Sequence, residues 1–251
     1  MPRSAKLRAV VLRTVDYGER DRVVTLLSRE RGKLSAFARG ARSSQRRFGG
    51  ALEPFNLLST ELTERGGDLW VLESAFVERA FGAVRGDLAR IACASYAVEL
   101  ARELVRDAEP HEELFDLVVS YLEKIDASPA QPWDLRGFEL DALRAAGLMP
   151  ALDGCARCGR PSGAAASRFD PGQGGVLCPG CAPLAGPGSL EIGSQALAAL
   201  RRVQRGEPAD APAATAAEAR ALLGAYLEFH LGKSLLSRRF LDEVGPFLSG
   251  A

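Results

Sequence analysis

The sequence predicts an α+β multidomain protein, in which an N-terminal five-stranded barrel precedes an α-helical domain with an inserted four-cysteine element. Three observations lead to this prediction. Short apolar or alternating runs with β-branched residues occupy residues 8–75. Apolar residues recur at helical spacing over residues 83–150 and again beyond residue 187. Two Cys-x-x-Cys pairs lie between these helical stretches, in a segment with few large apolar residues.

Five segments of the first 82 residues are predicted to be β-strands, because they are short, partly β-branched and separated by turn residues. The turns include Arg31–Gly32 and Gly66–Asp68. The expected strands are residues 8–13, 21–27, 33–39, 55–62 and 69–72. Five such strands fit a small barrel or a sandwich. A five-stranded, partly open barrel is the OB-fold, which commonly binds oligonucleotides on one face.

Two later stretches are predicted to form an α-helical domain. Pro110 marks a helix start, since proline suits the first helical position, and Gly147 with Pro150 ends a helix. The expected helices are residues 88–105, 110–125, 133–146, 194–205 and 213–236. The predicted domain borders are 1–82 for the OB-fold domain, 83–152 and 187–251 for the two parts of the helical domain, and 153–186 for the cysteine element.

Four cysteines predict a structural metal site within the inserted element. Each Cys-x-x-Cys pair presents two thiolates from one tight turn, and two pairs complete the tetrahedral sulfur shell that suits structural zinc. The ligands are Cys155, Cys158, Cys178 and Cys181. A closed shell leaves no position for a substrate, so the zinc is expected to be structural. Reduced thiols favour a cytoplasmic protein, and Cys93 is expected to be a small buried side chain.

The charge distribution predicts an anionic partner for the N-terminal domain. The chain has 32 basic and 32 acidic residues, yet residues 1–82 carry 15 Lys and Arg against 10 Asp and Glu. Such an asymmetry between two parts of a chain points to a local anionic partner. No signal peptide is evident, and no apolar run approaches the roughly 18 residues that a membrane helix needs. Contact with a membrane is therefore not expected.

The densest positive charge lies between Arg29 and Arg47, where Glu30 is the only acid. Its second half, residues 39–50, is predicted to be a mobile loop whose amides, hydroxyls and guanidinium groups suit phosphate oxygens. Phe37 and Phe48 could stack on bases there, although each also suits the core. A solvated loop that binds nothing is the alternative. The candidate DNA-binding residues are Lys33, Arg39, Arg42, Arg46 and Arg47, with Arg13 and Arg31 as further candidates.

The sequence contains no recognisable catalytic or nucleotide-binding motif. Gly232–Ser234 looks like the end of a P-loop, but the glycine required five positions earlier is Leu227. His111 and His230 lie in helical contexts that favour structural or surface roles. The protein is therefore expected not to be an enzyme. Arg238 and Arg239 either cap a helix end or supply a second basic contact, and the sequence does not separate these two interpretations.

An ordered set of motifs covers almost the whole chain. Besides the two cysteine pairs, it consists of Gly18–Asp21, Gly32–Arg42, Arg46–Gly50, Phe55–Leu58, Phe138–Leu140, Gly147–Leu148, His230–Lys233 and Ser237–Leu241. In this order, the motifs resemble the RecO family of bacterial recombination mediators. The resemblance implies an N-terminal OB-fold, a helical C-terminal domain and an inserted zinc element.

The same resemblance implies a function in DNA repair. It implies binding of single- and double-stranded DNA, annealing of complementary strands, and loading of RecA onto strands coated with single-strand-binding protein. The implied partners are RecR and the acidic C-terminal tail of single-strand-binding protein, in the cytoplasm at the nucleoid. No catalytic residues are implied.

Three other functions fit part of the sequence. An RNA-binding OB protein with a zinc ribbon would share the basic segment. A zinc-dependent hydrolase would need an open ligand position, which four cysteines do not leave. The third is a scaffold that binds only proteins and no oligonucleotide. The surface that meets a partner peptide and the oligomeric state are not specified by the sequence.

Overall fold

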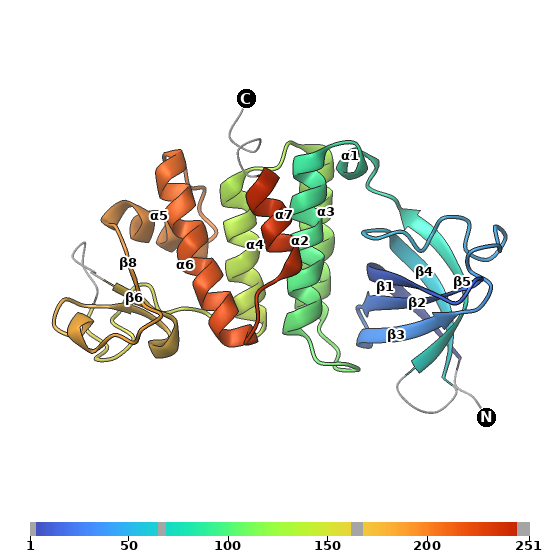
Figure 1. The fold of residues 1–251 in the computed structure, drawn as a ribbon, viewed down its shortest axis with the longest axis horizontal. Coiled ribbons are helices and arrows are strands. Elements are labelled where there is room, and N and C mark those ends of the chain that lie inside the picture. Colours follow the sequence, from blue (N-terminus) through green and yellow to red (C-terminus); the bar gives the residue numbers. More distant parts are fainter. Residues whose placement is uncertain (1–3, 65–68, 162–167, 245–251) are drawn as a thin grey trace. The chain divides into compact units, whose positions relative to one another are not determined.

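The computed structural model describes residues 4–64, 69–161 and 168–244 (Figure 1). The chain divides into two compact units, Met1–Pro129 and Ala130–Ala251. The first contains a β-barrel followed by helices, and the second contains helices and a small sheet beside the cysteines. The domain borders expected from the sequence stay a prediction. The turn expected at Gly66–Asp68 lies outside the described residues.

Five strands of the first unit close into a barrel with the order β1-β2-β3-β5-β4. Neighbouring strands pair antiparallel, except for β3 and β5, which pair in parallel. The strands are β1 (Ser4–Tyr17), β2 (Asp21–Ser28), β3 (Gly32–Ala38), β4 (Leu57–Glu64) and β5 (Leu69–Arg79). The five predicted strands are confirmed, and of the two architectures that the sequence allows, the structure has the barrel.

In the barrel strands, small or apolar residues that face inward alternate with residues that face outward. Along β3, the even-numbered residues from Gly32 to Ala38 are buried and the odd-numbered ones between them are partly exposed. Because successive strand residues point to opposite faces, one set fills the core and the other forms the outer face. On β1, a bulge between Val11 and Arg13 shifts the register against β2, and Arg13 then lies on the exposed side.

The chain between β3 and β4 is anchored to the barrel, whereas the sequence predicts a mobile loop. Phe48 and Leu52 are each 2% exposed and belong to the barrel core. The backbone N–H of Ala75 on β5 donates to the carbonyl of Arg47 at 3.0 Å. Because the Phe48 ring is buried, it is not accessible to a base, and Phe48 is a core residue.

Three α-helices complete the described part of the first unit: α1 (Gly82–Arg85), α2 (Leu88–Leu104) and α3 (Glu112–Ala127). Asp87 caps α2 by accepting a hydrogen bond from the backbone N–H of Arg90 at 2.8 Å. The turn between β2 and β3 packs tightly on the α2–α3 connection, because a Cβ at Gly32 would lie 1.7 Å from the carbonyl oxygen of Glu109. Only glycine fits this contact, and its φ of +65° favours glycine as well.

The described helices of the second unit are α4 (Pro132–Ala145), α5 (Ser194–Gln204), α6 (Ala213–Leu231) and α7 (Leu236–Val244). The sequence predicts one helix over 213–236, but α6 ends at Leu231. Gly232 adopts a left-handed conformation with φ 67° at the C-cap, which stops the helix. The side chain of Arg238 on α7 then lies directly over Gly224 of α6, where a Cβ would come within 1.7 Å of Nη1.

The cysteines lie beside a three-stranded sheet that the sequence analysis does not predict. Its strands are too short to show a periodicity: β6 (Arg168–Asp170), β7 (Gly175–Leu177) and β8 (Leu190–Glu191), in the order β7-β6-β8. The buried carboxylate of Asp170 accepts hydrogen bonds from the N–H groups of Gly172 at 2.9 Å and Gly186 at 2.7 Å. Across the described residues, none of the helices combines the length and the apolar character that a membrane span requires.

Candidate nucleic-acid interface and metal centre

Two connections meet at one end of the barrel and bring arginines together. The backbone N–H of Arg42, in the chain after β3, donates to the carbonyl of Arg20 in the β1–β2 turn at 3.1 Å. The N–H of Gly40 donates to the carboxylate of Asp21 at 2.7 Å. These bonds fix the β1–β2 turn against the segment that contains Arg39 and Arg46.

The arginines at this end are exposed and largely free of acidic partners, as is Arg13, which lies further along the barrel opposite Thr25 of β2. Among the described residues, no acid forms an ion pair with Arg13, Arg20, Arg39 or Arg46, and all four are exposed. Arg42 lies 3.8 Å from the carboxylate of Asp16 with 44% of its side chain exposed, a contact too weak to neutralise it. We call the five residues Arg13, Arg20, Arg39, Arg42 and Arg46 the arginine surface.

The other three candidates lie elsewhere or are already engaged. The side chain of Lys33 is only 17% exposed, and its ammonium contacts Asp107 at 3.2 Å and donates to the carbonyl of Arg102 at 2.9 Å. Arg47 donates to the carbonyl of Arg39 at 2.5 Å, and its guanidinium lies 5.0 Å from the ring centre of Phe48. Both side chains therefore hold the fold together.

Arg31 is exposed but lies at the opposite end of the barrel. It belongs to the β2–β3 turn, while Arg39 follows the last residue of β3. Seven strand residues separate the two ends by roughly 20 Å. The neighbouring Arg29 is paired with Asp116 at 3.1 Å and Glu112 at 3.2 Å, and the pKa of Arg29 is raised by its hydrogen bond with Asp116.

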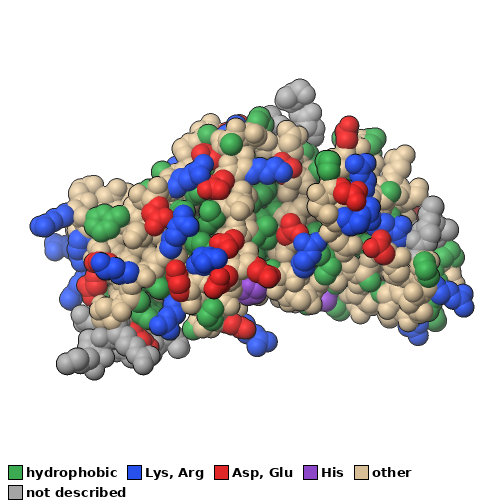
Figure 2. Space-filling model, turned by 180° about the vertical axis from the view of Figure 1, so that it is seen from behind, with side chains coloured by type: hydrophobic (Ala, Val, Ile, Leu, Met, Phe, Trp, Pro, Cys, Tyr) green, Lys and Arg blue, Asp and Glu red, His purple; other side chains and the backbone are tan. Residues whose placement is uncertain are grey.

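The space-filling view agrees with this distribution. In Figure 2 the barrel lies at the left, and Lys and Arg side chains gather along its left edge. Arg20 is the residue of this surface that the sequence analysis misses as a candidate. Its sequence signals are its place in a turn between two predicted strands and in the Gly18–Asp21 motif, because the neighbouring acids Glu19 and Asp21 offset the positive charge there.

The four cysteines converge as the sequence predicts. Their sulfur atoms all lie within 4.8 Å of one another, and Sγ of Cys158 is 3.8 Å from Sγ of Cys178. Zinc–sulfur bonds of about 2.3 Å in a tetrahedron place sulfur atoms roughly 3.8 Å apart. The four residues are therefore close enough to hold one metal ion.

Both Cys-x-x-Cys turns are held by the backbone. The N–H of Gly159 donates to the carbonyl of Cys155 at 2.9 Å, and the N–H of Cys181 donates to the carbonyl of Cys178 at 2.9 Å. Gly159 has a φ of +71°, which favours glycine in the first turn. These backbone bonds place the two thiols of each turn close together.

The thiols of this cluster differ in acidity. Burial opposes ionisation of Cys155, but backbone N–H groups, chiefly those of Cys178 and Cys158, lower its pKa to about 6. Burial raises the pKa of Cys181 to about 12, and hydrogen bonds among the neighbouring cysteines add to this effect. Cys155 therefore ionises readily whereas Cys181 resists ionisation, and a bound cation would favour the thiolate form of Cys181.

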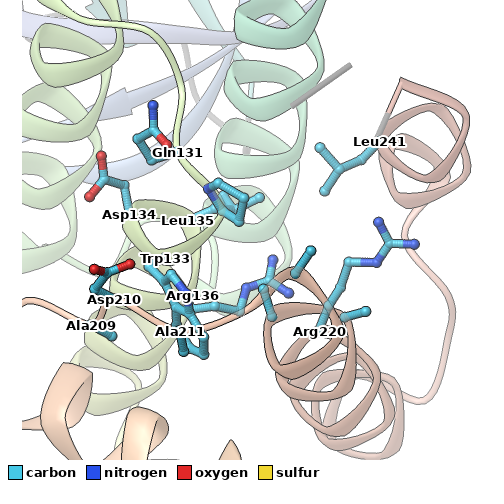
Figure 3. A pocket seen from close by; sticks show the side chains of 14 residues that line it. Gln131, Trp133, Asp134, Leu135, Arg136, Ala209, Asp210, Ala211, Arg220 and Leu241 are labelled. Atoms are coloured by element: carbon cyan, nitrogen blue, oxygen red, sulfur yellow. The ribbon is translucent and has the colours of Figure 1, made fainter. Parts of the chain in front are cut away.

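A cavity of about 500 Å³ lies within the second unit, between the start of α4, the start of α6 and α7 (Figure 3). Its walls are mostly apolar, including several alanines, Leu135 and Leu241. Arg136 extends into this region from α4 with a side-chain exposure of 3%, and its Nε lies 2.8 Å from Glu139. Neither Nη1 of Arg136 nor Nε1 of Trp133 has a hydrogen-bond partner among the described residues.

The first turn of α4 adds further donors to this cavity. The N-cap residue Gln131 makes no side-chain capping bond, and Pro132 has no N–H, while Asp134 places a negative charge in the first turn beside the positive helix end. Arg220 of α6 also lines it, paired with Asp242 at 2.9 Å. The cavity therefore combines an apolar wall with charged groups of both signs, because Asp134 and Asp210 line it together with Arg136 and Arg220.

Comparisons with known proteins match almost the whole chain. Residues 1–81 match the family described as recombination protein O N terminal, and residues 85–239 match recombination protein O C terminal. The DNA repair protein RecO of Anaeromyxobacter dehalogenans (strain 2CP-C) is 64% identical, with 98% of each chain covered. RecO of Myxococcus xanthus is 48% identical, with 94% of this chain and 96% of that one covered. RecO of Geobacter sulfurreducens is 42% identical, with 96% and 98% covered.

Proposed function

The chain belongs to the RecO family of DNA repair proteins, and from this premise we propose that it is a non-enzymatic mediator of recombination. In this proposal it binds single- and double-stranded DNA, anneals complementary strands and, with RecR, helps to load RecA onto strands coated with single-strand-binding protein. It acts in the cytoplasm, at the nucleoid.

The arginine surface is the observation that carries this proposal. Five exposed guanidinium groups without strong acidic partners lie on one barrel, and guanidinium groups bind phosphate oxygens with paired hydrogen bonds. Contacts of this kind are made to the DNA backbone and do not depend on the base sequence. Holding two strands on one positive surface lowers their mutual repulsion, which favours annealing without any bond chemistry.

Binding of single strands is expected to weaken steeply as salt rises. If the five arginines neutralise about five phosphates, the logarithm of the association constant should fall against the logarithm of the salt concentration with a slope of about −3.5. Titration of a labelled oligonucleotide at several NaCl concentrations measures this slope. Homopolymeric and mixed sequences should share it, and a slope near zero would exclude the arginine surface as the binding site.

The cavity beside Arg136 is the proposed site for the acidic C-terminal tail of single-strand-binding protein. A chain terminus offers a carboxylate for the donors of Arg136 and the α4 N-terminus. An apolar last side chain would fill the alanine-lined part of the cavity. Acidic residues further along the tail would meet Arg220 at the rim, since its side chain is 38% exposed.

Amidation of a tail peptide is expected to weaken its binding at least tenfold. The amide removes the negative charge that Arg136 and the helix end would bind, and charge-assisted hydrogen bonds contribute about 1.5–3 kcal/mol each. Fluorescence anisotropy with a labelled acidic peptide, as free acid and as amide, measures the difference. Arg220→Gln should weaken the free acid, while Arg144→Gln, on the same helix as Arg136 but outside the cavity, should not. Equal affinities for the two peptides would rule this site out.

The metal of the cysteine cluster is proposed to be zinc, with Cys155, Cys158, Cys178 and Cys181 as its ligands. Four thiolates close the coordination shell, so the ion would stabilise the fold and bind no substrate. This closed shell also disfavours a zinc-dependent hydrolase.

A further inference from the structure

An apolar stripe crosses the outer face of the barrel beside the arginine surface. Val15 on β1 pairs with Val23 on β2, Val23 pairs with Phe37 on β3, and Phe37 pairs with Val71 on β5. The four side chains therefore lie side by side on one face. Tyr17 extends the stripe at the end of β1, where it is 62% exposed.

Tyr17 is held in place although it is exposed. Its ring centre lies 5.6 Å from that of Phe37, with an angle of 83° between the ring planes. This edge-to-face contact is a favourable aromatic geometry. It fixes the Tyr17 ring and leaves most of it accessible. Stacking of a ligand on this ring would therefore cost little additional conformational entropy of the Tyr17 side chain.

Arginines surround this aromatic pair on the same face. Arg13 lies on the exposed side of β1, two residues before Val15, and Arg39 follows Phe37 by two residues. Arg20 lies in the turn that follows Tyr17, and its carbonyl is bonded to Arg42. An exposed ring flanked by unpaired cations fits a polyanion that carries flat aromatic groups, which is the chemistry of an unpaired nucleic-acid strand.

We infer that Tyr17 stacks on one unpaired base, supported by Phe37, while the arginine surface binds the adjoining phosphates. The inference rests on the proposed function and deepens it, because phosphate contacts alone do not distinguish single strands from duplexes. In a duplex the base faces are covered by neighbouring base pairs, so only an unpaired strand gains the stacking contact. The barrel thus prefers single strands through Tyr17 and tolerates duplexes through its arginines.

The test compares three ligands of equal length and charge per strand: an oligothymidine, the same strand with abasic sites, and a duplex. The full chain should bind the oligothymidine about tenfold more tightly than the abasic strand, as expected for one stacked base. The Tyr17→Ala variant should lose this tenfold preference. It should bind both single strands with the affinity that the unmodified chain has for the abasic strand, and its affinity for the duplex should be unchanged. Tyr17→Trp should keep the factor.

Phe76→Ala is the matched control, because Phe76 is 59% exposed on the same barrel but lies on β5 opposite Ser59, outside the stripe. It should leave all three affinities unchanged. Equal affinity of the unmodified chain for oligothymidine and abasic strands overturns the inference and leaves the proposed function intact. A Tyr17→Ala variant that still prefers oligothymidine over the abasic strand would also overturn the inference and leave the proposed function intact. Absence of binding to any strand overturns the proposed function itself.

Discussion

Replacement of Arg39, Arg42 and Arg46 by glutamate, which reverses the three charges, is expected to weaken DNA binding about a thousandfold or more. Each change removes a charge-assisted contact of roughly 1.5 kcal/mol and adds a repulsion against phosphate. Three such losses amount to about three orders of magnitude in the dissociation constant. Because none of the three guanidinium groups is buried in the barrel core, the variant should fold normally. Gel shifts with single strands and duplexes measure the effect, which should be similar for all sequences.

A second triple reversal separates this local effect from the change in net charge. Arg106, Arg157 and Arg160 are exposed outside the barrel, and no acid pairs with them among the described residues. Their replacement by glutamate changes the total charge by the same amount. This control should bind DNA nearly as well as the unmodified chain. If both variants lose binding equally, net charge alone determines affinity and the arginine surface has no special role.

Cys155→Ser is expected to release the metal and unfold the element around it. Structural zinc sites contribute on the order of 10 kcal/mol of binding free energy, and the segment has few large apolar residues with which to replace it. Elemental analysis should give one zinc per chain for the unmodified protein and much less for the variant. Limited proteolysis should then cut within residues 153–186, while the barrel keeps its DNA binding.

Cys93→Ala is the control for this loss, because Cys93 is fully buried in α2 and lies outside the cluster. It should keep the metal content of the unmodified protein. A Cys155→Ser variant that retains full zinc would refute the assignment of the four ligands.

The sequence predicts the elements of this fold well, because each carries a local signal. The five strands have the β-branched, turn-separated runs of barrel strands, and the Cys-x-x-Cys turns need only their own spacing to be recognised. The break between α6 and α7 was missed. It depends on Gly232 taking a left-handed conformation, which apolar spacing does not report.

The candidate interface was predictable only in part, because charge density does not show which arginines have partners. Lys33 and Arg47 belong to the same basic segment as Arg39, but contacts to Asp107 and to the Arg39 carbonyl engage them. The contact of Lys33 joins segments that are distant in the sequence, and that of Arg47 depends on how the loop after β3 folds. The unpaired donors of Arg136 and Trp133 are likewise visible only once α4, α6 and α7 are packed together.

The contact between Arg238 and Gly224 has a consequence for the neighbouring cavity. Arg238 is seated on α6 because position 224 lacks a methyl group, and the same helix α7 supplies Leu241 to the cavity wall. A Cβ at position 224 would displace the guanidinium of Arg238, but this group is the flexible end of a long side chain and can move aside without a shift of the α7 backbone. Gly224→Ala should therefore remove the contact with Arg238 and leave Leu241 in the cavity wall.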